Sequence, residues 1–329
     1  MLMNPYNTAN SSKQKAIALM NNYGSERKPF LFIVDFEMHK PIVLSVDEVS
    51  QSGVRFAIGK KETLLISKSI VFNTNPIDLE RYTESFNYVV EQISLGNSYL
   101  TNLTFPTKIE TNLSLEEIYT YSNARYKLLI ENEFVVFSPE CFVKIEDGII
   151  SSYPMKGTID ASIPKAEEII LSDEKEMAEH ITIVDLIRND LSIVAKNVRV
   201  EKFRYIDKIE TNKKSLLQVS SKISGDLQNG YNERIGDVIF SMLPAGSISG
   251  APKKKTIEII KHAENEKRGY YTGVFGYFDG NNLDSAVMIR FIEQTQKGMY
   301  YRSGGGITFM SNLKSEFQEL IDKVYVTFT

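Results

Sequence analysis

Residues 134–156 read FVVFSPECFVKIEDGIISSYPMK, with strand-forming runs on both sides of Asp147-Gly148. This dipeptide is strongly preferred in the type I′ turn of a tight β-hairpin. Counting outward from the turn sets Glu140 opposite Met155, so that Glu140 and Lys156 reach the same end of one ribbon. The segment therefore predicts an antiparallel hairpin that brings a carboxyl group and an amine close together.

A second hairpin is expected from Ala286 to Gly306, around Lys297-Gly298. The same count sets Arg290 opposite Gly305, beside the three consecutive glycines 304–306. Arginine offers a planar fork of donors, and glycine amides let an anion approach the backbone closely. This end of the second hairpin is therefore a candidate pocket for a carboxylate.

Two expected helices carry pairs of glutamates. Asp173 can cap a helix that holds Glu176 and Glu179. The last helix of the chain holds Glu316 and Glu319. Residues three apart share a helix face, so each pair presents two carboxylates in one direction. Two such pairs facing one cavity would repel each other unless a dication bound between them, and carboxylate oxygens suit Mg²⁺.

Apolar periodicity predicts one buried face on each of the longer helices. A helix is expected over residues 78–95, and Gly96 ends it. On the first helix that carries glutamates, the apolar side is expected to be Met177, Ile181 and Val184.

The first 75 residues are expected to form a small helix followed by several strands, with a loop at residues 73–76. The rest of the chain alternates antiparallel hairpins with helices and shows no regular strand-helix-strand repeat. This alternation favours an α+β fold over a parallel α/β sheet.

The composition excludes several classes of protein. The net charge of the 329 residues is -4, without the basic excess that is typical of proteins that bind nucleic acid. The apolar runs are far too short to span a membrane, and no signal peptide is expected. The single cysteine, Cys141, excludes an internal disulfide and fits a reducing compartment. We therefore expect a globular cytoplasmic protein.

Taken singly, each of these features has an ordinary structural explanation. Glu176 could complete a capping box with Asp173, and glutamate pairs on helices are usually solvated. Residues 304–306 could form a plain loop, and Lys156 before Gly157 could be a turn lysine. From the residues alone, the prediction stops at an α+β enzyme that binds an anion, with Mg²⁺ as one option.

Six motifs nevertheless occur in one order along residues 78–329, and together they closely resemble the chorismate-utilising enzymes. This family includes anthranilate synthase component I, aminodeoxychorismate synthase component I, isochorismate synthase and salicylate synthase. The motifs are Ser138-Pro139-Glu140, Pro154-Met155-Lys156-Gly157-Thr158, Ala178-Glu179-His180 with residues 183–190 (IVDLIRND), residues 244–253 (PAGSISGAPK), Ile289-Arg290 and Gly304-Gly305-Gly306-Ile307.

The resemblance implies a site that binds chorismate with Mg²⁺ on its C1 carboxylate. Glu140 matches the general acid that protonates the departing C4 hydroxyl. Glu179 and Glu319 match the metal ligands, with Glu176 and Glu316 as outer carboxylates that act through water. The residues assigned to the substrate pocket are Tyr271, Arg290, Gly304, Gly305, Gly306, Thr158, Ser249 and Lys253.

The third residue of the motif at 154–158 divides the family. Anthranilate and isochorismate synthases usually carry a small or apolar residue there, whereas aminodeoxychorismate synthases carry lysine, and this sequence has Lys156. A neutral lysine amine is a competent nucleophile, which implies attack on C2 and a covalent adduct. Leu100 stands where isochorismate synthases place a base lysine, and leucine cannot act as a base. The sequence is therefore most like aminodeoxychorismate synthase component I.

Two alternatives stay open at this point. One is anthranilate synthase component I, and the other is an inactive chorismate-binding subunit with a regulatory role. Retention of the acid, the lysine and the metal glutamates weighs against the second. Gln218 departs from the family, because many members carry a histidine there, and no segment like the tryptophan-binding one of anthranilate synthases is found.

The resemblance also implies the architecture and the partners. Two antiparallel β-sheets packed between helices are expected in one compact unit. Residues 1–75 are expected to be a shortened N-terminal subdomain that completes a sheet, and residues 76–329 the catalytic domain. No glutaminase domain fits in the chain, so ammonia is expected from a separate glutamine amidotransferase subunit.

Overall fold

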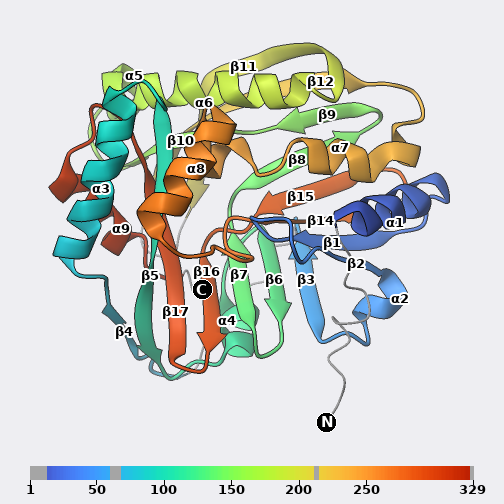
Figure 1. Ribbon diagram of the computed structural model, residues 1–329, viewed down its shortest axis with the longest axis horizontal. Coiled ribbons are helices and arrows are strands. Elements are labelled where there is room, and N and C mark those ends of the chain that lie inside the picture. Colours follow the sequence, from blue (N-terminus) through green and yellow to red (C-terminus); the bar gives the residue numbers. More distant parts are fainter. Residues whose placement is uncertain (1–12, 60–67, 211–214, 327–329) are drawn as a thin grey trace.

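The computed structural model describes residues 13–59, 68–210 and 215–326, and within them the chain forms two β-sheets (Figure 1). One sheet has nine strands and the other has eight. The strand pairs in both sheets are antiparallel, which confirms the expected α+β class. None of the described helices is long and apolar enough to cross a membrane.

The nine-stranded sheet, called the first sheet below, has the order β10 (Met155–Asp160), β12 (Ser215–Leu227), β9 (Ile149–Ser152), β8 (Cys141–Glu146), β15 (Leu283–Val287), β14 (Val274–Phe278), β1 (Phe30–Val34) and β2 (Ile42–Ser45), with β11 (Ala195–Glu210) paired to β12. The second sheet has the order β13 (Gly250–Ala251), β5 (Leu100–Thr111), β17 (Gly298–Ile307), β16 (Phe291–Thr295), β7 (Phe134–Ser138), β6 (Tyr126–Ile130) and β3 (Val54–Ile58), with β4 (Phe72–Asn75) paired to β5. The helices are α1 (Lys13–Ser25), α2 (Val46–Val49), α3 (Leu79–Ser94), α4 (Leu115–Tyr121), α5 (Ala166–Ser172), α6 (Glu174–Ser192), α7 (Ile235–Ser241), α8 (Lys253–Glu264) and α9 (Leu313–Asp322), with 3-10 turns η2 (Tyr231–Arg234) and η3 (Gly246–Ile248).

The two sheets pack face to face around one apolar cluster. Leu31 and Phe275 of the first sheet belong to the same buried cluster as Leu128 and Phe291 of the second sheet. Side chains from α1, α6 and α7 pack on the first sheet, and side chains from α3, α8 and α9 pack on the second. Figure 1 shows α1 and α7 at one end of the molecule and α3 and α9 at the other. The expectation of two antiparallel sheets packed between helices is therefore confirmed.

The turn of the first expected hairpin is confirmed. Asp147 and Gly148 both have positive φ angles, 51° and 77°, as a type I′ turn requires. Glu146 pairs with Ile149 across the turn. The hairpin is shorter than expected, however, because residues 134–138 form β7 in the second sheet, whereas β8 and β9 lie in the first.

Beyond β8 and β9, the expected pairing of Glu140 with Met155 is wrong. Met155 pairs with Ser220 of β12, and Glu140 lies between β7 and β8. Pro139 and Pro154 carry no N–H group for a ladder, and each stands where the chain leaves one strand for the next. The two proline residues therefore interrupt the segment that the sequence analysis predicts as one continuous hairpin.

The second expected hairpin forms with a register shifted by two residues. Thr295 pairs with Gly298, so the turn is at residues 296–297 rather than at Lys297-Gly298. Arg290 precedes β16 with a φ of 53° and does not stand opposite Gly305. Arg290 can therefore approach the glycine residues only through its long side chain.

The expected helices form, with one shift in the buried face. Gly96 follows α3 with a φ of 75°, which confirms the predicted end. On α6 the predicted apolar side is wrong at Ile181, which is 49% exposed. Glu179, His180 and Ile183 are buried instead. The inward face of α6 is therefore partly polar, and it turns Glu179 toward the interior.

Strands from the first 75 residues enter both sheets rather than one. β1 and β2 extend the first sheet, and β3 and β4 extend the second. Residues 73–75, expected in a loop, belong to β4 and pair with residues 108–110 of β5. The division of the chain at residue 75 stays a prediction, but the strands on either side of it share both sheets.

Candidate active site

One cavity of about 960 Å³ is lined by both sheets and by α6 and α9. It gathers most of the residues that the sequence singles out for chemistry. Those in its lining are Glu140, Lys156, Thr158, Glu176, Glu179, Tyr271, Arg290, Gly304, Gly305, Gly306 and Glu319, and the departing residue Gln218 also lines it.

Lys156 enters this cavity from a bulge in β10. The pairing of β10 with β12 shifts within residues 155–158, and Gly157 has a φ of 79°. Lys156 Nζ lies 3.3 Å from Glu179 Oε2. A Cβ atom added to Gly306 would also lie 3.3 Å from Lys156 Nζ. The bulge therefore directs the amine into the cavity, and the missing side chain of Gly306 leaves room for it.

Glu140 contributes a partly buried carboxyl group, which accepts a hydrogen bond from the Ser247 hydroxyl. Burial raises the pKa of Glu140, and the opposing effects of Ser247, Lys156 and Lys323 are too small to cancel it. A raised pKa keeps a carboxyl group protonated closer to neutral pH, which suits a proton donor. Ser247 is missed as a partner in the sequence, since 107 positions separate it from Glu140.

The four predicted glutamates gather beside the glycine residues of β17. A Cβ atom added to Gly305 would lie 3.4 Å from Glu316 Oε2 and 3.6 Å from Glu319 Oε1. Glu316 is buried and stays out of the cavity lining, whereas Glu319 lines it. Glu176 and Glu179 reach the cavity from α6. The absence of a side chain at Gly305 thus lets α9 bring its carboxylates next to the strand.

Lysine side chains neutralise these carboxylates. Lys175 Nζ lies 3.1 Å from Glu316 Oε1 and 3.9 Å from Glu179 Oε1, so it bridges α9 and α6. Lys323 Nζ lies 2.6 Å from Glu319 Oε1. At Glu319, burial acts to raise the pKa, but the surrounding lysines, Lys323 first, outweigh burial and lower it. The Glu319 carboxylate is therefore held charged by ammonium groups.

The donor chemistry of this cluster fits Mg²⁺. Burial, followed by repulsion from Glu179, raises the pKa of Glu176, so added positive charge nearby would stabilise its carboxylate. The Lys175 ammonium stands between the two helices in the place where such charge is needed. Among the described residues, no group of three acidic side chains already converges as a metal site. Glu179 and Glu319 would hold a dication after their lysine partners moved aside.

Arg290 supplies a guanidinium group to the same cavity. Its Nη1 donates to the backbone oxygen of Lys323 at 2.7 Å, and its Nη2 donates to Tyr325 Oη at 3.0 Å. Tyr271 lines the cavity from the loop between α8 and β14, and burial raises the pKa of its hydroxyl, which stays a donor. Together with residues 304–306, these donors form a surface suited to a carboxylate.

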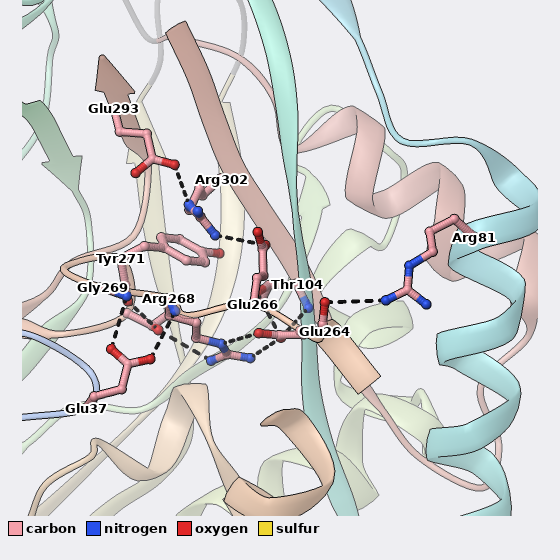
Figure 2. A network of polar contacts seen from close by, with 11 residues as sticks. Glu37, Arg81, Thr104, Glu264, Glu266, Arg268, Gly269, Tyr271, Glu293 and Arg302 are labelled. Atoms are coloured by element: carbon pink, nitrogen blue, oxygen red, sulfur yellow. Dashed lines mark hydrogen bonds and ion pairs between the residues drawn. The ribbon is translucent and has the colours of Figure 1, made fainter. Parts of the chain in front are cut away.

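Arg302 is a cationic residue of the cavity that the sequence prediction missed. Its Nε donates to Glu293 at 2.8 Å and its Nη1 donates to Glu266 at 3.0 Å (Figure 2). Side chains alternate along a strand, so Arg302 points to the same side of β17 as Gly304 and Gly306. That alternation is the sequence signal that would have identified it.

Ser249 and Lys253 do not line this cavity, so the structure does not bring them to the expected pocket. The Ser249 hydroxyl donates to the backbone oxygen of Ala245 at 2.9 Å. Lys253 begins α8 and points toward α6, where its Nζ lies 2.6 Å from Asp190 Oδ1 and 2.9 Å from the backbone oxygen of Met242. Both residues therefore support the loop at 244–253 rather than the cavity wall.

A family model described as chorismate binding enzyme matches residues 62–329. The chain belongs to the chorismate-binding enzymes. The cavity of this chorismate-binding enzyme contains Glu140, Lys156 and Glu179 of the sequence motifs. Residues 13–59, which supply β1, β2 and β3, lie before the matched region.

Several known proteins are similar to this chorismate-binding enzyme. An uncharacterised PabA-like protein of Haemophilus influenzae is 51% identical over 97% of this chain and 98% of its own length. Anthranilate synthase component 1 of Aquifex aeolicus is 39% identical over 56% of this chain and 38% of its own length. Aminodeoxychorismate synthase component 1 of Bacillus subtilis is 30% identical over 76% of this chain and 55% of its own length.

A solved structure shares the fold. The crystal structure of a 2,3-dihydroxybenzoate-specific isochorismate synthase from Bacillus anthracis aligns with a TM-score of 0.71. The alignment covers 95% of this chain and 86% of that one, at 19% identity. The two-sheet architecture is therefore that of chorismate-utilising enzymes, and at this identity the likeness concerns the fold alone.

The contact between Ser247 and Glu140 generates a prediction about pH. Turnover of chorismate should fall as the pH rises and Glu140 loses its proton. Because the Ser247 hydroxyl stabilises the charged carboxylate, Ser247→Ala should raise the pKa of Glu140 further and move this fall to higher pH. Profiles of kcat/KM against pH for the wild type and the variant measure the shift. The exposed Ser162→Ala is the control, and a fall that stays in place or moves to lower pH contradicts the prediction.

Proposed function

We propose that this protein is an aminodeoxychorismate synthase component 1, which converts chorismate and ammonia to 4-amino-4-deoxychorismate for 4-aminobenzoate and folate synthesis. The observation that carries the proposal is the Lys156 amine, which faces Gly306 inside the cavity and lies 3.3 Å from Glu179. The likeness to aminodeoxychorismate synthase component 1 of Bacillus subtilis supports the same activity.

Lys156 is the proposed nucleophile. Its neutral amine attacks C2 of chorismate, the ring double bond shifts, and the C4–oxygen bond breaks. The departing hydroxyl takes a proton from Glu140 and leaves as water. Ammonia then attacks C4, the double bond shifts back, and the C2–nitrogen bond breaks, which frees the neutral amine of Lys156. Glu140 recovers its proton from the ammonium group formed at C4. The net reaction consumes chorismate and ammonia and releases the amino product and water.

The surroundings of Lys156 favour amination over hydration. Leu100 Cδ1 would lie 3.5 Å from a Cβ atom added to Gly306, so an apolar side chain borders the same glycine that the amine faces. Leucine offers no base that could activate a water molecule for attack at C2. In this proposal the amine itself therefore occupies C2, and ammonia reacts at C4.

The carboxylate of the substrate needs positive charge and donors. We assign this task to Arg290, Tyr271 and the amides of residues 304–306. Glu179 and Glu319 would hold Mg²⁺, with the neighbouring glutamates of α6 and α9 as outer partners. When bound, Mg²⁺ supplies positive charge that binds and orients the C1 carboxylate.

Ammonia is proposed to come from a separate glutamine amidotransferase subunit, since the described residues are accounted for by the two-sheet chorismate-binding fold. The cytoplasm is the proposed location. The use of a single cysteine, Cys141, which is free and buried, is typical of proteins from a reducing compartment.

The second candidate is anthranilate synthase component 1, because a relative with that name is 39% identical over 56% of this chain.

Incubation of the purified protein with chorismate, Mg²⁺ and an ammonium salt should give a product that keeps its enolpyruvyl group, as identified by chromatography and mass spectrometry. Release of fluorescent anthranilate would support the second candidate. No turnover of chorismate would leave only a binding role. Glutamine should replace the ammonium salt only after a cognate amidotransferase is added.

Lys156→Ala tests the covalent route. The variant should lose activity by about a thousandfold, on the order of 4 kcal/mol in the barrier, because the nucleophile is absent. Intact-protein mass spectrometry with chorismate and without ammonia should show a chorismate-derived adduct on the wild type and none on the variant. Lys165→Ala, at an exposed lysine, is the matched control. Wild-type activity in Lys156→Ala would reduce Lys156 to a positioning role.

The metal proposal predicts that Glu179→Gln loses binding of Mg²⁺ as well as activity. The change removes one charge with almost no change in shape, so the fold should persist, as circular dichroism can verify. Titration calorimetry with Mg²⁺ in the presence of chorismate measures the loss directly. Glu174→Gln, at the exposed first residue of α6, is the control. Full wild-type activity in excess EDTA would overturn the metal role.

A further inference from the structure

Residues 36 and 37, which lie before the family-matched region, are tied to the backbone at Arg268 and Gly269. Glu37 Oε1 accepts the N–H of Arg268 at 3.0 Å, and Glu37 Oε2 accepts the N–H of Gly269 at 3.1 Å. The N–H of Phe36 donates to the backbone oxygen of Gly269 at 2.8 Å. One carboxylate thus satisfies two consecutive backbone donors, as Figure 2 shows.

The side chain of Arg268 is fixed as firmly as its backbone. It is 2% exposed, and its Nε and Nη2 donate to the two oxygens of Glu264 at 2.9 and 2.6 Å. Its Nη1 donates to the backbone oxygen of Ile248 at 2.9 Å, and its Nη2 to that of Asn102 at 2.7 Å. Phe36 covers the guanidinium at 4.8 Å. Residues 36 and 37 therefore contact Arg268, which is itself hydrogen-bonded to residues that line the cavity.

The contacts of Glu37 with Arg268 and Gly269 lie at the start of the loop that carries Tyr271. The N–H of Tyr271 donates to the backbone oxygen of Arg268 at 3.2 Å, which makes a tight turn. Thr272 follows with a φ of 58°, an unfavourable conformation for a threonine, and lines the cavity beside Tyr271. A strained turn persists only where its surroundings hold it. Glu37 stabilises this turn through its backbone N–H groups, and the contacts of the Arg268 side chain stabilise it as well.

We propose that Glu37 is a positioning residue, which fixes the Arg268–Thr272 turn and thereby the Tyr271 hydroxyl in the substrate pocket. The proposal deepens the proposed function and rests on its assignment of Tyr271 to the substrate carboxylate. Glu37 itself touches no substrate. It acts by giving two backbone N–H groups a charged acceptor, a contact that is stronger than a neutral hydrogen bond.

The test is a double-mutant cycle on chorismate binding. Glu37→Gln keeps the shape but replaces one acceptor oxygen by a donor, so one of the two N–H groups loses its partner. Glu37→Asp keeps the charge but shortens the side chain by one methylene group, so its effect should be smaller. Each is combined with Tyr271→Phe. The Kd for chorismate is measured by titration calorimetry in proteins that also carry Lys156→Ala, where no covalent adduct forms, and KM and kcat are measured with Lys156 in place. Glu48→Gln is the matched control, since Glu48 accepts the N–H of Ser45 in the same N-terminal segment.

With Tyr271 intact, Glu37→Gln should weaken chorismate binding about tenfold and raise KM more than it lowers kcat. In the Tyr271→Phe background it should leave binding almost unchanged. Glu37→Asp should lie in between, and Glu48→Gln should bind as the wild type does. Equal effects of Glu37→Gln with and without the Tyr271 hydroxyl, or no effect on Kd, would reduce Glu37 to an anchor of the N-terminal segment and overturn the proposal. Because binding is measured without product formation, a product other than 4-amino-4-deoxychorismate would contradict the proposed function alone.

Discussion

The site depends on a stretch of backbone that carries no side chains. At Gly305 and Gly306 of β17, Cβ atoms would come within 3.3 to 3.8 Å of Lys156, Glu179, Glu316 and Glu319. At Gly304 a Cβ atom would lie 2.3 Å from the backbone oxygen of Leu103 on β5, so that the two strands could not pair as they do. At Gly305 and Gly306 a methyl group would already touch these side chains, and a longer side chain would occupy the space that they share. The bare strand is what allows charged groups from three directions to share one cavity.

Such crowding of charge needs compensation, and the chain provides it internally. Lys175 joins the carboxylates of α6 and α9, Lys156 contacts Glu179, and Lys323 contacts Glu319. Removing one member of a buried ion pair leaves the other charge buried without a partner, and its desolvation is then not compensated. The resting site is thus a network of ion pairs that a substrate anion and a cation would rearrange together. Binding of the two is expected to be interdependent, because each takes over a partner of the same lysines and glutamates.

Local signals in the sequence predict the parts of this structure that depend on neighbouring residues. The turn at Asp147-Gly148 and the end of α3 at Gly96 follow from backbone preferences, and both form as expected. The motifs then predict which residues gather, and the cavity collects most of them. Ser249 and Lys253 show the limit of a prediction from motifs. A residue in a motif can support a loop instead of contacting a ligand.

The parts that could not be predicted depend on partners far apart along the chain. The predicted pairing of Glu140 with Met155 is wrong because proline residues end the ladder there. Which strand Met155 pairs with next depends on the arrangement of the whole sheet. Arg302 is supported by Glu266 and Glu293 on other elements, and Glu37 meets Arg268 across 231 positions. No periodicity within one segment encodes such contacts. They become visible only when the strands are in place.

The entry of the first 75 residues into both sheets has a consequence for how the chain can be divided. A shortened chain that began at residue 62 would lose β1 and β3, and would leave β14 and β6 as open edges. All five residues of β6 and four of the five in β14 are buried, so both edges would be apolar as well as unpaired. Unprotected edges of this kind pair with other molecules and lead to aggregation. The boundary of the recognisable family is therefore not a boundary of autonomous folding, and the segment before it protects the sheets from self-association.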